Sequence, residues 1–291
     1  MTARHKAILA IILFSLLGAG TAPVIKIGLA HIPPLTYAFL RFFLATIILL
    51  PFFLTKTVLT RKKIITLLPL SLLATINIVL FVLGLRLTTA TIGQLLYAGT
   101  PLLTTALLFV LFGERLRKIK LIGILIGFVG VLIVIFLPLL ESGNIYAGDL
   151  IGNTIIALAV VCWSLYMVYS KKYLSRFSPL ILTAIFIVTT TVVLFPVFLY
   201  ELTSYAFWWK NIGLVDITSI AYVAIVATIV TYILNQYAIK HGGSMVASLS
   251  FYLTPLVTYG IANILLREVL TTGLVIGGML ALFGVYLATK Q

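Results

Sequence analysis

The sequence predicts an all-α integral membrane protein with ten transmembrane helices, arranged as two inverted five-helix repeats whose N- and C-termini face the cytoplasm. Three observations predict this class: an apolar composition, ten hydrophobic windows, and a second half that resembles the first. Hydrophobic residues make up 62% of the 291 residues and charged residues 9%, whereas soluble domains carry about 25% charged residues. No polar stretch is long enough for a soluble domain, so we expect nearly the whole chain in the lipid bilayer.

Ten windows are each long enough to cross a bilayer, which takes about 20 mainly apolar residues for roughly 30 Å of hydrocarbon. They cover residues 7–29, 33–54, 64–87, 89–112, 119–140, 149–170, 179–202, 216–239, 244–266 and 271–289. The first window resembles a signal peptide because Arg4 and Lys6 precede it, but it exceeds the usual hydrophobic region of about 7–15 residues. We therefore interpret it as the first membrane helix.

The basic residues predict how these helices are oriented. A formal net charge of +14 would be compatible with nucleic-acid binding, but the lysines and arginines lie in short loops beside apolar segments, where they set topology. With a cytoplasmic N-terminus, fifteen basic residues lie inside, four lie outside, and Arg41 lies within a helix. This bias predicts a multi-pass protein of the cytoplasmic (inner) membrane, with the lipid bilayer and a small solute as partners and no nucleic acid.

Self-comparison shows that the second half of the chain repeats the first. At an offset of 154 residues, Thr100-Pro101-Leu102 matches Thr254-Pro255-Leu256, Glu114 matches Glu268, and Gly130-Val131 matches Gly284-Val285. At an offset of 145 residues, Lys26 matches Lys171 and Pro34 matches Pro179. The predicted repeats cover residues 1–140 and 149–291.

Each predicted repeat holds five windows, an odd number, so the second repeat must enter the membrane in the opposite direction from the first. Inverted halves can exchange conformations and open a site near the midplane first to one side and then to the other. This arrangement favours a transporter over a channel, a receptor or an enzyme.

Several segments resemble a known family. Residues 34–45 (PLTYAFLRFFLA) are similar to the second-helix signature of EamA-type proteins in the drug/metabolite transporter superfamily, as are Thr100-Pro101 and residues 112–116 (FGERL). Thr254-Pro255 and residues 267–270 (REVL) repeat the signature in weaker form, with arginine in place of the usual glycine. The resemblance covers nearly the whole chain. It implies a ten-helix, two-repeat carrier with a central cavity, often an exporter of amino acids, related metabolites or drugs.

Arg41 is the first candidate for substrate binding, because it lies about seven residues into the second window. An arginine at a helix centre costs roughly 2.5–3.5 kcal/mol on insertion scales, so its presence needs a reason. A guanidinium that faces a cavity could bind a substrate carboxylate or phosphate bidentately. The alternative is a structural role, in which the side chain reaches the outer headgroups or the carbonyls of a neighbouring helix.

Uncharged polar and aromatic residues near the window centres are the other candidates for the cavity lining. They are Asn77, Gln94, Tyr97, Trp163, Tyr166, Tyr232, Asn235, Ser250 and Tyr252. Each could instead make a polar contact between packed helices. Pro101 and Pro255 are predicted helix breaks at matching positions, and paired breaks of this kind point to a binding site. The alternative for each proline is a simple kink.

Glu114 and Glu268 lie at matching helix ends, where they could form ion pairs with basic loop residues or act as gate contacts. No carboxylate or histidine falls at the centre of a window, and Cys162 is the one cysteine. The sequence therefore offers no plausible catalytic constellation, metal site or cofactor site.

These patterns together predict a secondary transporter that moves amino acids or related zwitterionic or anionic solutes by alternating access, as an exporter or a facilitated exchanger. We expect a monomer or a weak homodimer. The alternatives are a multidrug exporter or an uptake carrier of the same fold, for example for S-adenosylmethionine, and, further away, a membrane-embedded enzyme or scaffold. A cation exporter would usually need an acidic site, which the windows lack.

Overall fold

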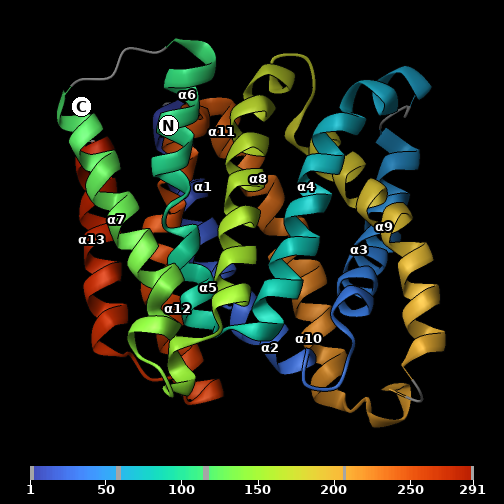
Figure 1. The fold of residues 1–291 in the computed structure, drawn as a ribbon. Helices are drawn as coiled ribbons and strands as arrows, with labels where there is room; N and C mark the ends of the chain where they lie inside the picture. The colour runs from blue at the N-terminus through green and yellow to red at the C-terminus, as the bar shows by residue number, and fades with distance from the viewer. Residues whose placement is uncertain (1–2, 57–59, 114–117, 206–207, 290–291) are drawn as a thin grey trace.

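The computed structural model describes residues 3–56, 60–113, 118–205 and 208–289, and within these ranges the chain forms a bundle of helices without strands (Figure 1). The first half contains α1 (Ala3–Gly18), α2 (Thr21–Gly28), α3 (Pro34–Lys56), α4 (Arg61–Leu87), α5 (Ala90–Tyr97), α6 (Thr100–Phe112) and α7 (Lys118–Leu140). The second half contains α8 (Leu150–Leu174), α9 (Pro179–Ser204), α10 (Leu214–Ala224), α11 (Thr231–Ser248), α12 (Ser250–Leu266) and α13 (Thr272–Thr289). Short 3-10 turns lie at Ile145–Ala147 and Trp208–Asn211, and a π-helix, η3, spans Ile225–Val230.

The helices have the length and composition of membrane spans. Among the described residues, eight helical segments are long and apolar enough to cross a bilayer: Ile8–Gly28, Pro34–Pro51, Arg61–Leu87, Ala90–Phe112, Lys118–Leu140, Ile145–Leu174, Pro179–Ser204 and Leu214–Ser248. Two shorter apolar helices, Thr254–Leu266 and Thr272–Ala288, fall in the ninth and tenth predicted windows. Large apolar side chains such as Val110, Leu139 and Ile264 are exposed on the outside of the bundle, as expected for a surface in contact with lipid. The chain is thus an integral membrane protein.

Several of these segments are interrupted near their middle. α5 ends at Tyr97 and α6 begins at Thr100, just before Pro101, because proline lacks the amide hydrogen that would continue the hydrogen-bond ladder. Pro255 does not break its helix, contrary to the prediction, because α12 continues through it. In the second half the interruptions lie earlier, at Gly243 within α11, where φ is 85° and ψ is 165°, and at Leu249, where α11 ends and α12 begins.

Residues that the offsets of 145 and 154 pair in sequence have matching environments in space. The hydroxyls of Thr46 on α3 and Thr191 on α9 are partners at the offset of 145 and share a hydrogen bond of 2.8 Å. Lys26 donates from Nζ to the carbonyl oxygens of Leu85 and Arg86, at 2.9 and 3.2 Å, at the C-terminus of α4.

Lys171, the counterpart of Lys26, donates to the carbonyl oxygens of Ile239 and Lys240 on α11, at 3.3 and 3.2 Å. These carbonyls end the first part of α11, because the backbone is not helical at Gly243 (φ 85°, ψ 165°). These two acceptors are the counterparts of Leu85 and Arg86 at the offset of 154. Each half therefore satisfies the same helix carbonyls with the same lysine, since carbonyls at a helix end have no partner within the helix.

The α7–α13 pair packs backbone against backbone through glycine. A Cβ atom added at Gly284 would lie 2.2 Å from the amide nitrogen of Gly127, and one at Gly130 would lie 2.3 Å from the amide nitrogen of Ala281. Small residues permit such close approach, and the resulting van der Waals contacts stabilise the helix pair. Such contacts matter in a bilayer because the hydrophobic effect does not drive helices together there. The spacings of small residues on both helices thus serve helix packing.

Replacing Gly284 with alanine is therefore expected to destabilise the bundle, because the added methyl group meets rigid backbone rather than a movable side chain. Overpacking of this kind costs about 1–3 kcal/mol. The midpoint of thermal unfolding in detergent should fall clearly below that of the natural protein. Gly260→Ala on α12 is the matched control, since a Cβ atom there meets nothing within 4 Å. Equal midpoints for the two variants would contradict this packing.

Candidate substrate cavity

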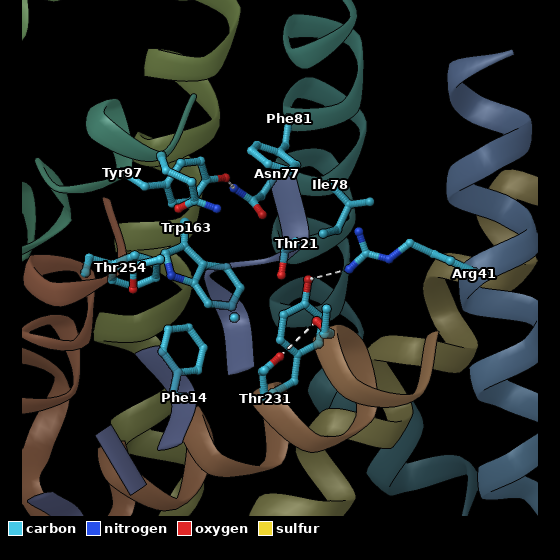
Figure 2. Close-up of a pocket in the computed structure, with 15 residues that line it drawn as sticks. Phe14, Thr21, Arg41, Asn77, Ile78, Phe81, Tyr97, Trp163, Thr231 and Thr254 are labelled. Carbon is cyan, nitrogen blue, oxygen red and sulfur yellow. Dashed lines mark hydrogen bonds between the residues drawn. The ribbon is translucent and has the colours of Figure 1, made fainter. Parts of the chain in front are cut away.

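A cavity lies between the helices of the two halves and is lined by residues from both (Figure 2). It encloses about 550 Å³ of empty space, including its opening. α1 and α2, α3, α4 and α5 contribute from the first half, whereas α8, η3, α11 and α12 contribute from the second. The lining combines aromatic rings with a few polar side chains and one cation, and the described residues that form it include no carboxylate.

Six residues that the sequence singled out meet in this cavity: Arg41, Asn77, Gln94, Tyr97, Trp163 and Tyr232. Tyr166 lies behind Trp163, with ring centroids 5.1 Å apart, and its hydroxyl accepts a hydrogen bond of 2.7 Å from Gln236. Asn235 is buried on α11 without a partner for its amide among the described residues. The Ser250 hydroxyl donates to the carbonyl oxygen of Ala247 at the start of α12.

Two predicted site residues cannot be placed in this way. Tyr252 belongs to α12, but its side chain lies outside the described residues, and Glu114 lies outside them altogether.

Eight lining residues were not predicted from the sequence: Phe14, Gly18, Thr21, Ile78, Phe81, Ala227, Thr231 and Thr254. Phe251, the counterpart of Tyr97 at the offset of 154, also lines the cavity. Phe14, Gly18 and Thr21 show that the first membrane segment borders the cavity, where α1 ends and α2 begins. The run of small residues from Gly18 to Ala22 was a usable signal, because it interrupts an otherwise bulky apolar window. Nothing in the sequence marks the apolar residues Ile78 and Ala227 as lining.

Arg41 brings a positive charge into the cavity from α3. Its side chain is 1% exposed. Its Nε donates to the Thr228 hydroxyl at 3.0 Å and its Nη2 to the Tyr232 hydroxyl at 3.3 Å. The guanidinium carbon also lies 4.8 Å from the centroid of the Phe42 ring, a favourable cation–π distance. Within the described part of the chain, Nη1 has no hydrogen-bond partner and no carboxylate forms an ion pair with this side chain.

The π-helix η3 explains how Thr228 reaches Arg41. The Thr228 hydroxyl donates at 2.7 Å to the carbonyl oxygen of Val223, five residues earlier. This leaves the hydroxyl oxygen free to accept from Arg41. A π-helix inserts one extra residue into a turn, and such insertions are frequent at functional sites. Here the turn precedes Thr231 and Tyr232, which line the cavity.

The remaining polar groups divide into satisfied and unsatisfied ones. The Asn77 amide donates to the Tyr97 hydroxyl and to the carbonyl oxygen of Ala159, and so fixes the Tyr97 ring. Gln94 Oε1 and Trp163 Nε1 have no partner among the described residues. Buried polar atoms are nearly always hydrogen-bonded, so unpartnered ones within a cavity indicate a bound water or ligand.

Aromatic rings form the apolar side of the cavity. Phe251 contacts Phe14 edge-on at 5.4 Å between centroids and lies 5.8 Å from Tyr97, its counterpart at the offset of 154. The Trp163 and Tyr232 rings are 5.7 Å apart. Rings at these distances are suited to hold an apolar portion of a small solute.

The comparisons with known proteins agree with this architecture. The model of the EamA-like transporter family matches twice, at residues 5–136 and 150–290. The chain belongs to the EamA-like transporter family. This family assignment covers almost the entire sequence and matches the resemblance seen in its motifs.

Relatives of this EamA-like chain are similar along its whole length. It is 29% identical over 290 residues to an uncharacterized transporter of Archaeoglobus fulgidus, covering 98% of each chain. It is 29% identical over 287 residues to the uncharacterized transporter YyaM of Bacillus subtilis, covering 95% of this chain and 91% of that one. A solved structure superposes with a TM-score of 0.66 at 19% identity, covering 98% of this chain and 96% of the other, and shows the same fold.

Glu268 links the two halves of this EamA-like chain at the start of α5. Its carboxylate accepts hydrogen bonds from the amides of Ala90 and Thr91, at 2.7 and 2.9 Å, and from the Thr91 hydroxyl at 2.6 Å. These donors form the N-terminus of α5, the helix that carries Gln94 and Tyr97. The carboxylate therefore lies at a helix end as expected, but its partners are helix amides rather than basic loop residues.

Glu268→Ala is expected to destabilise the protein strongly, because it leaves two amides and a hydroxyl unsatisfied at the buried start of α5. Each unsatisfied buried group costs about 1–3 kcal/mol. Asp149→Ala is the matched control, since Asp149 caps α8 through one amide, that of Gly152, in a less buried place. Thermal unfolding in detergent should give a larger fall in midpoint for Glu268→Ala, and an equal or smaller fall would contradict this role.

Proposed function

We propose that this EamA-like protein is a secondary transporter that binds a small zwitterionic or anionic metabolite, foremost an amino acid, in the cavity around Arg41. Transport is proposed to occur by alternating access, as export or facilitated exchange. The observation that carries the proposal is a buried guanidinium with a free donor in a cavity whose described lining has no carboxylate.

An isolated buried charge is expensive, so Arg41 needs an anion or strong acceptors around it. Two hydroxyls and the Phe42 ring supply part of this stabilisation. Nη1 is buried and has no acceptor among the described residues. A solute carboxylate fits this donor, because guanidinium–carboxylate hydrogen bonds are strong and directional.

The other unsatisfied groups suit the remaining parts of an amino acid. Gln94 Oε1 is an acceptor that could bind an ammonium group, and Trp163 Nε1 is a second donor for a carboxylate. The rings of Phe14, Phe251 and Tyr97 would contact an apolar side chain. A zwitterion thus uses the acceptor, the donors and the rings together.

The proposed topology has ten spans, in two inverted repeats with cytoplasmic termini. Support comes from the two family matches, one in each half, and from the lysines that cap equivalent helix ends. The N-terminal end of α1 and the C-terminal end of α13 also lie at the same end of the bundle (Figure 1). This arrangement requires an even number of membrane crossings. The positive-inside bias then assigns this end to the cytoplasm.

The proposed location is the cytoplasmic (inner) membrane, with the protein as a monomer or weak homodimer. One relative, 31% identical over 157 residues and covering 51% of this chain and 48% of its own, is named the uncharacterized inner membrane transporter YedA of Escherichia coli. The orientation of the basic loops supports the same membrane.

Flux measurements in proteoliposomes test the substrate class. We expect uptake of one or more labelled amino acids or related carboxylates, and no comparable uptake of cationic drugs. Arg41→Gln should lower carboxylate flux by about 10- to 100-fold, the range expected when a charge-assisted hydrogen bond is lost. It should also remove the preference for an acid over its uncharged amide, because the amide does not need the guanidinium.

Arg86→Gln is the matched control, since Arg86 is an exposed arginine at the end of α4. It should keep the flux and the acid preference of the natural protein. Gel filtration and unfolding midpoints verify that both variants fold. The proposal fails if Arg41→Gln transports carboxylates as well as the control does, or if only cationic drugs are transported.

A further inference from the structure

A second cavity lies away from the central one, between the start of α4 and the end of α8. These helix ends lie at the same end of the bundle as the start of α1 and the end of α13 (Figure 1). It holds about 820 Å³ of empty space, including its opening. The start of α4 forms one wall and the end of α8 with the turn after it forms the other. We name it the basic groove, defined by its cations Lys62, Lys63, Lys172 and Arg176. It thus joins a helix of the first half to one of the second.

The basic groove concentrates positive charge. The described residues that line it include four basic side chains and no aspartate or glutamate. The first turn of α4 also contains no acidic residue, although a helix N-terminus carries a partial positive charge that favours an anion. Two cations follow this terminus directly, at Lys62 and Lys63. An anion in the groove would be attracted by these cations.

The side chains that line the basic groove suit a phosphate group that is attached to an apolar group. The hydroxyls of Thr60 and Ser175 lie in the lining together with the basic residues, and so do the rings of Tyr173 and Phe177. Lysine, arginine and hydroxyl groups contact phosphate oxygens through hydrogen bonds. Aromatic rings with polar edges are typical of the depth at which headgroups meet hydrocarbon.

The position of the basic groove indicates where the phosphate comes from. Directly after its lysines, α4 exposes the apolar side chains Ile64, Ile65 and Leu68 on the outside of the bundle. The groove therefore lies where a lipid-facing helix surface ends and its charged end begins. A phospholipid could place its headgroup in the groove and its acyl chains along these residues. Basic pockets between transmembrane helices are suited to anionic headgroups.

We propose that the basic groove is a binding site for the headgroup of an anionic phospholipid. The lipid bridges α4, which carries Asn77 of the substrate cavity, and α8, which carries Trp163. It thereby stabilises the contact between the two halves at this end of the bundle. The site is independent of the solute that the central cavity binds.

Titration of the purified full-length protein with phosphatidylglycerol tests the site. The protein is held in nonionic detergent, and the unfolding midpoint is followed as phosphatidylglycerol or phosphatidylcholine is added. We expect phosphatidylglycerol alone to raise the midpoint in a saturable way, because a ligand stabilises the folded state that it binds. Native mass spectrometry then counts the bound lipids.

The double variant Lys62→Gln/Lys172→Gln removes one cation from each wall. Its affinity for phosphatidylglycerol should fall roughly 30-fold, since each basic residue near an anionic lipid contributes about a factor of five. Lys118→Gln/Lys120→Gln, at the start of α7, is the matched control, because both lysines lie at the same end of the bundle but outside the groove. It should bind within about two-fold of the natural protein.

Three results would overturn the proposal. The first is an equal response to phosphatidylcholine, and the second is an equal loss of affinity in the control variant, which would reveal general surface attraction. The third is stabilisation by inorganic phosphate as large as that by phosphatidylglycerol, which would assign the groove to a free anion. Because the readout is lipid binding, it does not depend on whether solute flux is observed.

Discussion

Inside a bilayer every backbone amide and carbonyl must find its partner within the protein, and the helix ends of this chain depend on that constraint. Helix ends expose amides and carbonyls that a continuous helix would satisfy. The structure provides a charged side chain for several of them: Lys26 binds carbonyls at the end of α4, Lys171 binds carbonyls before the kink at Gly243 in α11, and Glu268 binds the first amides of α5. Charged residues that would be costly in lipid therefore replace lost helix hydrogen bonds.

The same requirement explains the polar lining. Between the broken segments, the π-helix supplies Thr228 to Arg41, and Asn77 fixes the ring of Tyr97. Among the described residues that line the cavity, three buried atoms remain without a hydrogen-bond partner: Nη1 of Arg41, Oε1 of Gln94 and Nε1 of Trp163. Two donors and an acceptor, surrounded by aromatic rings, describe a small polar ligand with an apolar part. The proposed function rests on these unpaired atoms.

The two halves have equivalent scaffolds, but they contribute different side chains to the cavity. Lys26 and Lys171 make equivalent contacts, one in each half. The Thr46–Thr191 hydrogen bond and the close α7–α13 contact join equivalent helices of the two halves. Arg41, however, corresponds to Phe186 at the offset of 145, and the Phe186 ring lies 5.4 Å from that of Phe42 and 5.2 Å from that of Tyr232. Equivalent helices provide the packing, whereas the unequal pair places one charge in the cavity. Because only one of the two equivalent positions carries a guanidinium, the charge lies on one side of the cavity. Two equivalent arginines would not create this asymmetry.

The sequence by itself determined the class of protein, the apolar windows and the family, because hydropathy and motif order are properties of the chain alone. It also marked six lining residues, among them Arg41 and Trp163, since polar or bulky aromatic groups at a window centre need a reason to be there. Tertiary structure decided which face each helix turns to the cavity, so that Tyr166 lies behind Trp163 while Thr231 faces inward. It also decided the π-helix and the partners of Glu268. Helix rotation and capping arise from contacts between distant segments, and spacing along one segment carries no record of them.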